Sequence, residues 1–368
     1  MLLTGTGGTG GWPQPGCRCA SCQRAGSAGL RRKPGGVVLD GIVAFTPGQP
    51  PSRGTGRSSG AAHRIDAVPG GFDVTGPDGS RLLLAAGPGH QPQPQAGAEP
   101  YDLALLDLLD NPAQLGWLRQ TGLVHAQTTV VALYTDHRVS SAAELARRCE
   151  LWHVRHGSDN QLFTGASGTQ PSVGGRPQRT LLVGGARSGK STEAELRLAA
   201  EPQVTYVAAG PWQAWTGVDG QPDAEWAARV ARHRARRPSW WRTTETLDVA
   251  DLLRHREGVL LVDGIGTWLA GVMDSAGLWQ DTCSDNPDLP DQRPADLVRA
   301  QIDDLVDAWQ QTAAVVVAVT DEAGSGLVPP YPAGRVFRDE LGWLFQRLAA
   351  ESELVLHVVA GRLTTLPG

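Results

Sequence analysis

One motif limits what this chain of 368 residues can fold into. Residues 184–191 read GGARSGKS and match the pattern G-x-x-x-x-G-K-[ST] at every fixed position. The motif follows the apolar run RTLLV and precedes a helical stretch, which is the context that a phosphate-binding loop requires. Its glycines let successive backbone N–H groups converge on phosphate oxygens, and the N-terminus of the helix adds partial positive charge. We therefore expect such a loop between a strand at 179–183 and a helix from about 190.

Lysine is rare in this chain, and one of its two lysines lies inside the loop. Apart from Lys33 and Lys190, the Lys and Arg residues are all arginine, so arginine clusters are weak evidence for an anion-binding surface. Lys190 would place a compact charge on the β- and γ-phosphates, and Ser191 would offer its hydroxyl to Mg²⁺. A glycine-rich turn with a solvated lysine is the alternative. The remaining members of the expected phosphate cradle are Gly184, Gly185, Ala186, Arg187, Ser188 and Gly189.

The overall composition narrows the function classes. The chain carries 33 Lys+Arg against 38 Asp+Glu, a formal net charge of -5, and a mean hydropathy of -0.23. This mild acidity gives no support to a protein that coats nucleic acid or a membrane surface. No apolar run approaches the roughly 18–20 residues that a spanning helix needs, and the N-terminus lacks the features of a signal peptide. We expect a cytoplasmic protein with no membrane span and no nucleic-acid partner.

A segment rich in Gly, Ser, Thr and Pro divides the chain. Residues 157–178 show no apolar periodicity, which is typical of a linker. We therefore expect a first domain over 1–156 and a second domain over 179–368. The first reads as a smaller, β-rich α+β domain. Its expected elements are a hairpin around 77–79, a helix over 113–122, a strand over 128–135 and a helix over 140–152, with a capping box from Ser140 or Ser141 to Glu144.

The second domain alternates strands and helices regularly, which favours parallel βαβ units. We expect a mostly parallel sheet flanked by helices, of the type found in P-loop NTPases. The expected strands are 179–183, 204–208, 259–262, 313–320 and 353–359. Two helices are expected to begin at about 190 and 264, and three more to span 223–237, 295–311 and 333–352. A loop insertion is expected over 277–294. Asp263 is the expected carboxylate near the metal; an aspartate that only begins a turn with Gly264 is the alternative.

His233 allows two interpretations. On a helix it shares a face with Trp226 and Val230, and this pattern alone favours a core histidine. The alternative is a nucleophile that carries a nucleotide between two substrates, a role that suits a neutral imidazole. Several arginines nearby could stabilise a triphosphate: Arg232, Arg234, Arg236 and Arg237.

The segment from about 179 to 363 resembles the bifunctional adenosylcobinamide kinase / adenosylcobinamide-phosphate guanylyltransferases of cobalamin biosynthesis. The stretches that carry the resemblance occur in family order: GGARSGKS, AARVARHRARRP, WRTTE, LLVDGIGTWLAGVM, VTDEAGSGLVP and FRDELGWLFQRLAAESELVLHVVAG. The resemblance implies that ATP or GTP phosphorylates the aminopropanol hydroxyl of adenosylcobinamide. GTP would then donate GMP to the new phosphate and release pyrophosphate. It further implies Mg²⁺ and a homo-oligomer such as a trimer.

The resemblance also assigns roles to individual residues. It makes His233 the carrier of GMP, as a phosphoramidate, which reverses the reading from the helix pattern alone. It implies further nucleotide contacts at Ala208, Ala209, Gly210, Arg234, Ala235, Arg236, Arg237, Glu245 and Asp263. The turn after His233 reads Arg-Ala-Arg-Arg-Pro where the family usually has Arg-Asp-Gly-Arg-Pro. Asp263 and Asp321 stand where the family usually has glutamate and asparagine.

Three of the five cysteines, Cys17, Cys19 and Cys22, lie too close together for disulfides among them and indicate metal or redox chemistry. The stretch TGTGGTGGWPQPGCRCASC resembles the start of metallo-β-lactamase-fold phosphodiesterases that carry a structural zinc. The resemblance implies a shortened relative that is non-catalytic, because the H-x-H-x-D-H signature is absent, with Zn²⁺ on three thiolates and one further ligand. An irregular domain that binds no metal is the alternative. Cys149 and Cys283 read as buried thiols.

The sequence is therefore compatible with three functions. The first is the two-step kinase and guanylyltransferase. The second is a kinase that has lost the transferase step and keeps an idle histidine. The third is a zinc-dependent hydrolase or regulatory module in the first domain, joined to a phosphate loop that senses nucleotide.

Overall fold

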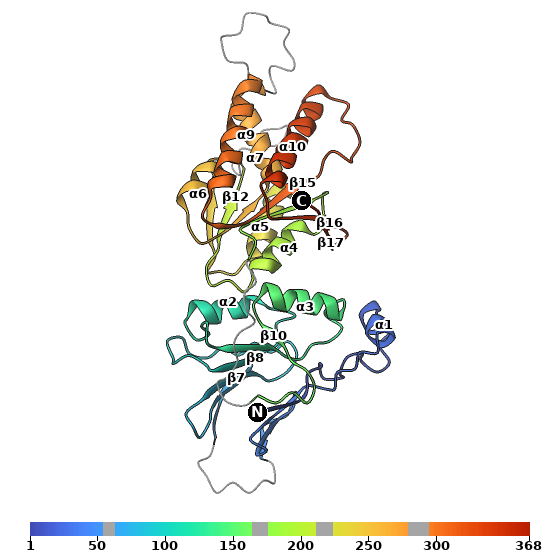
Figure 1. Ribbon diagram of the computed structural model, residues 1–368, viewed down its shortest axis with the longest axis vertical. Helices are drawn as coiled ribbons and strands as arrows, with labels where there is room; N and C mark the ends of the chain where they lie inside the picture. Colours follow the sequence, from blue (N-terminus) through green and yellow to red (C-terminus); the bar gives the residue numbers. More distant parts are fainter. Residues whose placement is uncertain (54–62, 164–175, 211–223, 279–293) are drawn as a thin grey trace, which may run out of the picture. The chain divides into compact units, whose positions relative to one another are not determined.

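The computed structural model describes residues 1–53, 63–163, 176–210, 224–278 and 294–368 (Figure 1). They form two compact units: unit 1 is Met1–Gly174 with Arg197–Pro202, and unit 2 is Gly175–Leu196 with Gln203–Gly368. Most of the predicted loop insertion, with Cys283, and the predicted helix start at Asp223 lie outside the described residues.

Unit 2 is built on a sheet in the order β13-β12-β14-β15-β11-β16-β17. All neighbouring strands pair in parallel except β16 and β17, which are antiparallel. The prediction of a mostly parallel sheet is therefore confirmed. The strands are β11 (Arg179–Gly184), β12 (Thr205–Ala208), β13 (Arg242–Glu245), β14 (Val259–Asp263), β15 (Val315–Asp321), β16 (Leu354–Val359) and β17 (Arg362–Leu366).

Helices cover both faces of this sheet. In Figure 1, α7, α9 and α10 lie on one side of the strands, and α4 and α5 lie on the other. Buried side chains of α7, α9 and α10 share a core with alternate strand residues such as Leu260 and Val262. Trp268 and Trp309 are fully buried there, and each would cost roughly 3–5 kcal/mol if cut to alanine. The helices are α4 (Lys190–Leu198), α5 (Ala224–Arg236), α6 (Val249–His255), α7 (Ile265–Ser275), α9 (Pro294–Gln311) and α10 (Pro332–Ala350).

The pattern-based prediction missed β13, α6 and β17. Both missed strands lie at the edges of the sheet, and their sequences RTTE and RLTTL are polar and mostly exposed. An edge strand needs less apolar burial than a central one, so it gives a weak hydrophobic signal. The missed helix is seven residues long, which is too short for a clear apolar period.

Unit 1 contains two sheets that share one hydrophobic core. Leu3, Val37 and Phe45 of the first sheet pack with Leu84 and Leu105 of the second. The first sheet has the order β1-β2-β3-β4 and the second β10-β9-β8-β7-β6-β5. The strands are β1 (Leu2–Gly5), β2 (Gly36–Leu39), β3 (Val43–Phe45), β4 (Ser52–Arg53), β5 (Arg64–Val68), β6 (Gly71–Thr75), β7 (Arg81–Ala85), β8 (Leu103–Leu106), β9 (Thr129–Ala132) and β10 (Arg155–His156).

The helices of unit 1 are α1 (Ala20–Ser27), α2 (Ala113–Gln120) and α3 (Ala142–Leu151). The hairpin predicted around 77–79 is present, since β6 and β7 pair antiparallel on either side of it. The N-terminal strand β1 and the helix α1 were not predicted. Cys149 is buried, as expected.

The first residues of the predicted linker pack against the N-terminal strand. Thr6 N–H donates to Asp159 Oδ1 at 2.8 Å, and Phe163 N–H donates to Met1 O at 2.8 Å. Residues 157–163 therefore form part of unit 1, and residues 164–175 lie outside the described ranges.

Across the ranges that the structure covers, none of the helices combines the length and the apolar character needed to cross a lipid bilayer.

The N-cap of α3 gives a first testable prediction. Ser141 has extended backbone, and its Oγ accepts the Glu144 N–H at 3.1 Å, so Ser141 rather than Ser140 caps the helix. Ser141→Ala should lower the free energy of unfolding of unit 1 by about 1 kcal/mol, because one helix N–H loses its partner. Hydrogen exchange of the α3 amides during urea titration would measure this.

Ser140→Ala is the matched control. Ser140 bonds Arg24 through its backbone carbonyl, which alanine keeps. Equal losses for the two substitutions would contradict the assignment of the cap.

Candidate functional site

The phosphate loop joins β11 to α4 with a backbone that requires glycine at two positions. Gly189 has a φ of +101°, and a β-carbon at Gly184 would lie 2.5 Å from the carbonyl oxygen of Val358. Glu193 N–H donates to Gly189 O at 2.9 Å, so the loop leads directly into the first turn of α4. The predicted loop thus ends at a helix N-terminus beside the carboxyl end of a central parallel strand, where anions bind.

Lys190 lies inside this loop and is only 9% exposed. Its Nζ donates to Gly185 O at 3.1 Å and lies 2.9 Å from Asp321 Oδ1. Asp321 ends β15, the strand that pairs with β11. The ammonium is therefore held between the loop and the neighbouring strand, where the motif predicts the β- and γ-phosphates.

Asp263 ends β14, and its carboxylate receives side chains from three other elements. Ser191 Oγ from α4 donates to Oδ1 at 3.2 Å, and Tyr206 OH from β12 donates to Oδ2 at 2.6 Å. Nδ1 of His233 from α5 lies 3.5 Å from the same Oδ2, at the long end of hydrogen-bonding distance. Ser191, predicted to bind the metal, and His233, the predicted nucleophile, therefore both lie beside the carboxylate of Asp263.

The charge on this carboxylate is set by these contacts. Burial by itself would raise the pKa of Asp263, but hydrogen bonds from His233, Tyr206 and Ser191 lower it below its ordinary value. Burial also raises the pKa of Glu195, whose partner is Arg236 at 3.1 Å. Burial and the nearby Asp263 charge raise the pKa of Tyr206, so its hydroxyl stays protonated as a donor.

The donor set fits the metal that the motif implies. Ser191 Oγ and Asp263 Oδ1 are two oxygen atoms 3.2 Å apart beside the phosphate loop. Mg²⁺ prefers oxygen ligands and usually keeps several waters, so two protein oxygens and phosphate oxygens suit it.

His233 lines a pocket and is not a core residue. Its side chain is 21% exposed. Val230, which shares its helix face, lines the same pocket, whereas the side chain of Trp226 is outside what the structure describes. The lining residues are Tyr206, Ala208, Ala209, Gly210, Val230, His233, Arg234, Arg237, Thr243, Glu245, Asp263, Gly264 and Thr267.

Most of the nucleotide contacts predicted outside the phosphate loop line this pocket. Arg234 NH2 lies 2.5 Å from Glu245 Oε1, and Ala208, Ala209 and Gly210 form the wall after β12. Two predicted residues are not part of the lining: Ala235 is exposed, and Arg236 pairs with Glu195 instead.

Sequence reasoning missed Tyr206, Thr243 and Thr267 in the pocket, and Glu195, the partner of Arg236. Tyr206 had one usable signal, because it is a tyrosine in an otherwise apolar strand, and a buried tyrosine hydroxyl usually has a partner.

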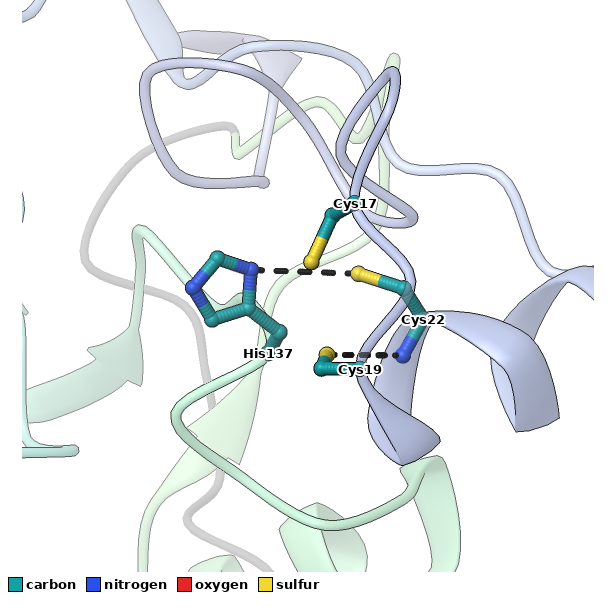
Figure 2. A group of neighbouring side chains, drawn as sticks. All are labelled: Cys17, Cys19, Cys22 and His137. Atoms are coloured by element: carbon teal, nitrogen blue, oxygen red, sulfur yellow. Dashed lines mark hydrogen bonds between the residues drawn. The ribbon is translucent and has the colours of Figure 1, made fainter.

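Unit 1 contains a separate cluster of side chains of the types that can bind a metal ion. The Sγ atoms of Cys17, Cys19 and Cys22 and a ring nitrogen of His137 all lie within 4.8 Å of one another. Figure 2 shows the histidine ring and the cysteines converging from two segments of the chain. Cys22 Sγ lies 3.8 Å from His137 Nδ1, and Cys22 N–H donates to Cys19 Sγ at 3.4 Å. His137 is therefore the candidate for the fourth zinc ligand, which the sequence did not identify.

The thiols of this cluster differ in environment. Burial raises the pKa of Cys22 to about 11, whereas the Cys22 backbone N–H lowers the pKa of the exposed Cys19. Ser21 Oγ donates to Val139 O at 2.6 Å, and Arg24 donates to Ser140 O. The helix α1, which contains Cys22, is thus bonded to the loop that carries His137.

An arginine occupies the carboxyl edge of the parallel strands in unit 1. Arg138 contacts Asp107 at 2.9 Å, Asp110 at 2.6 Å and Asp136 at 2.8 Å. Burial raises the pKa of Asp107, and Arg138 opposes that effect. Ligands of open α/β sheets bind at this edge, and here its carboxylates are paired with a guanidinium of the same chain.

Comparison with known proteins gives a consistent result for unit 2. Residues 180–366 match the family model described as cobinamide kinase / cobinamide phosphate guanyltransferase. The matched residues begin at 180, so the resemblance of the first domain stays a prediction.

Three curated proteins match the same half of the chain. The bifunctional adenosylcobalamin biosynthesis protein CobP of Pseudomonas aeruginosa is 37% identical over 196 residues, which is 52% of this chain and 98% of that protein. The bifunctional adenosylcobalamin biosynthesis proteins CobU of Escherichia coli and Salmonella typhimurium are each 37% identical, over 186 and 191 residues, or 49% of this chain and 95% of each protein.

This match confirms the resemblance drawn from the motifs of unit 2. The chain therefore belongs, through residues 180–366, to the cobinamide kinase / cobinamide phosphate guanyltransferase family.

Proposed function

We propose that unit 2 catalyses two successive reactions on adenosylcobinamide. A nucleoside triphosphate first phosphorylates its aminopropanol hydroxyl, and GTP then transfers GMP to that phosphate to give adenosylcobinamide-GDP. Family membership supports both reactions. The observation that carries the assignment of residues is the Asp263 carboxylate, which contacts Ser191 of the phosphate loop through one oxygen and faces His233 with the other.

The kinase step uses positioning and charge more than covalent chemistry. The loop amides and Lys190 hold the β- and γ-phosphates, and Ser191 and Asp263 would hold Mg²⁺, which offsets phosphate charge when bound. The substrate hydroxyl oxygen forms a bond to the γ-phosphorus as the bond from that phosphorus to the β-phosphate oxygen breaks. The hydroxyl proton passes to water, and the nucleoside diphosphate leaves.

The transferase step uses His233 as a nucleophile. Asp263 Oδ2 lies 3.5 Å from Nδ1 and so favours the tautomer that carries its proton on Nδ1, which leaves the Nε2 lone pair for attack. A bond forms between Nε2 and the α-phosphorus of GTP as the bond to the β-phosphate oxygen breaks, and pyrophosphate leaves. An oxygen of the substrate phosphate then attacks the same phosphorus, the P–N bond breaks, and His233 is regenerated. The carboxylate stabilises the positive charge on the phosphorylated ring.

The two alternatives are not favoured. The curated relatives are named as bifunctional proteins, and the pocket beside His233 keeps Glu245 and Asp263, which argues against a kinase alone. A hydrolase in unit 1 would need an open metal position. The cysteine cluster offers four protein ligands, and Arg138 occupies the strand edge.

Labelling by GTP tests the transferase step. Incubation with α-labelled GTP should leave label on the protein that is stable to alkali and lost in acid, as a phosphoramidate is. His233→Ala should abolish this label. His255→Ala is the matched control, because His255 also faces an aspartate, Asp251 at 2.8 Å, but lies outside the pocket. Active kinase without any labelled protein would exclude the covalent step.

Lys190→Arg tests the phosphate loop. A guanidinium is a broad fork where the loop needs a compact charge, so both half-reactions should fall at least about a hundredfold while the fold survives. Lys33→Arg, at the other lysine of the chain, should leave both rates unchanged. Product assays with adenosylcobinamide, together with circular dichroism, measure this. Near-normal activity of Lys190→Arg would contradict the role of the loop.

We further propose that Cys17, Cys19, Cys22 and His137 hold one structural Zn²⁺ in unit 1, in a shortened metallo-β-lactamase-like fold. Ligand atoms around a tetrahedral zinc lie roughly 3.5–3.8 Å apart, close to the 3.8 Å between Cys22 Sγ and His137 Nδ1. The Cys22 N–H bond to Cys19 Sγ is the kind of contact that orients a metal ligand. Four protein ligands leave no position for a reacting water.

Metal analysis tests this proposal. The purified chain should contain about one zinc, and His137→Ala or Cys22→Ser should lose it and lower the thermal stability of unit 1. Cys149→Ser is the control, since Cys149 is a buried cysteine outside the cluster. Cobalt in place of zinc should give thiolate charge-transfer bands. A chain free of zinc that also fails to bind cobalt would contradict the proposal.

A further inference from the structure

We propose that Tyr206 is a positioning residue for His233, an inference that rests on the proposed transferase step. Tyr206 lies on β12 and is 4% exposed. It acts on the histidine indirectly, through two parts of its own side chain: the hydroxyl acts through Asp263, and the ring acts through Arg237.

The hydroxyl fixes the carboxylate oxygen that faces the histidine. Tyr206 OH donates to Asp263 Oδ2 at 2.6 Å, and this is the oxygen that lies 3.5 Å from His233 Nδ1. Ser191 contacts the other oxygen, Oδ1. The tyrosine hydroxyl therefore acts on the transferase side of the carboxylate and not on the side of the phosphate loop. A hydrogen bond to a charged group is worth more than a neutral one, so it restrains the carboxylate strongly.

The aromatic ring fixes the end of the helix that carries the histidine. The guanidinium of Arg237 lies over the Tyr206 ring, 3.6 Å from its centroid, which is the geometry of a cation–π contact. Arg237 Nε donates to the backbone carbonyl of His233 at 3.0 Å. The ring thus holds the arginine, and the arginine holds the last turn of α5 beside the pocket.

The strand register explains why the tyrosine is at this position. Tyr206 pairs with Leu261 and Ala208 pairs with Asp263 between β12 and β14. Tyr206 and Asp263 therefore point to the same face of the sheet as diagonal neighbours, which long side chains can bridge. This is the face opposite to the core that holds Val207 and Val262, and it is the face that α5 covers in Figure 1.

Two substitutions separate the hydroxyl from the ring. Tyr206→Phe removes the bond to Asp263 and keeps the surface under Arg237, and Tyr206→Leu removes both. In single-turnover reactions with α-labelled GTP, Tyr206→Phe should slow labelling of His233 about tenfold at saturating GTP. Tyr206→Leu should slow it by about a further fivefold. The GTP concentration for half-maximal rate should change less than about twofold for Tyr206→Phe, because the hydroxyl positions the nucleophile and does not bind the nucleotide.

The kinase step and a second tyrosine provide the controls. Phosphorylation of adenosylcobinamide by Tyr206→Phe should fall less than the labelling of His233, because the lost hydroxyl bonds Asp263 Oδ2 and Ser191 contacts the other oxygen, Oδ1. Tyr101 in unit 1 is a matched residue: it is buried, its OH donates to Asp73 at 2.7 Å, and Arg81 lies over its ring at 4.4 Å. Tyr101→Phe should change neither step.

Each outcome either supports or overturns the positioning role of Tyr206. A tenfold loss in histidine labelling that clearly exceeds the loss in the kinase step supports the positioning role. Wild-type labelling by Tyr206→Phe, or equal losses in the kinase and transferase steps, would overturn it and leave the proposed function intact. An unaltered chain that never becomes labelled on His233 would overturn the proposed function and, with it, this inference.

Discussion

The functional site depends on the contacts that surround the carboxylate of Asp263. A buried charge is costly unless it is paired and hydrogen-bonded, and this one is 12% exposed and contacted by Ser191, Tyr206 and His233. Each partner comes from a different element, so the position of the carboxylate at the end of β14 sets the geometry of α4, β12 and α5 around it. The phosphate loop contacts one oxygen of this carboxylate, and the histidine pocket contains the other.

In unit 1, buried carboxylates are also paired, but with an arginine. Arg138 satisfies three carboxylates at the strand edge, and one of them, Asp107, is fully buried. Removing that arginine would leave the buried Asp107 carboxylate without its charge partner, which is strongly destabilising. The cysteine cluster is the contrasting case, because thiols and an imidazole converge there and the neighbouring helix is bonded to the loop of His137.

Local patterns in the sequence predicted the phosphate loop, the alternation of strands and helices in unit 2, and the carboxylate at the end of an apolar strand. These features depend on residues that are close in sequence. Tyr206 and His137 could not be predicted in this way. Tyr206 reaches Asp263 only because β12 is placed beside β14, and strand order does not follow from alternation. His137 joins cysteines that lie more than a hundred positions earlier in the chain. The helix pattern around His233 was misleading because its partly apolar face lines a pocket instead of the core.

The most direct test of the site is to identify which ring nitrogen of His233 carries phosphorus. The chain would be labelled with ¹⁵N at histidine, reacted with GTP and Mg²⁺, and examined by ³¹P and ¹⁵N NMR. Because Asp263 faces Nδ1, we predict a single phosphoramidate whose phosphorus is coupled to Nε2 of His233. A phosphorus bonded to Nδ1, or to any other histidine, would contradict the arrangement around Asp263.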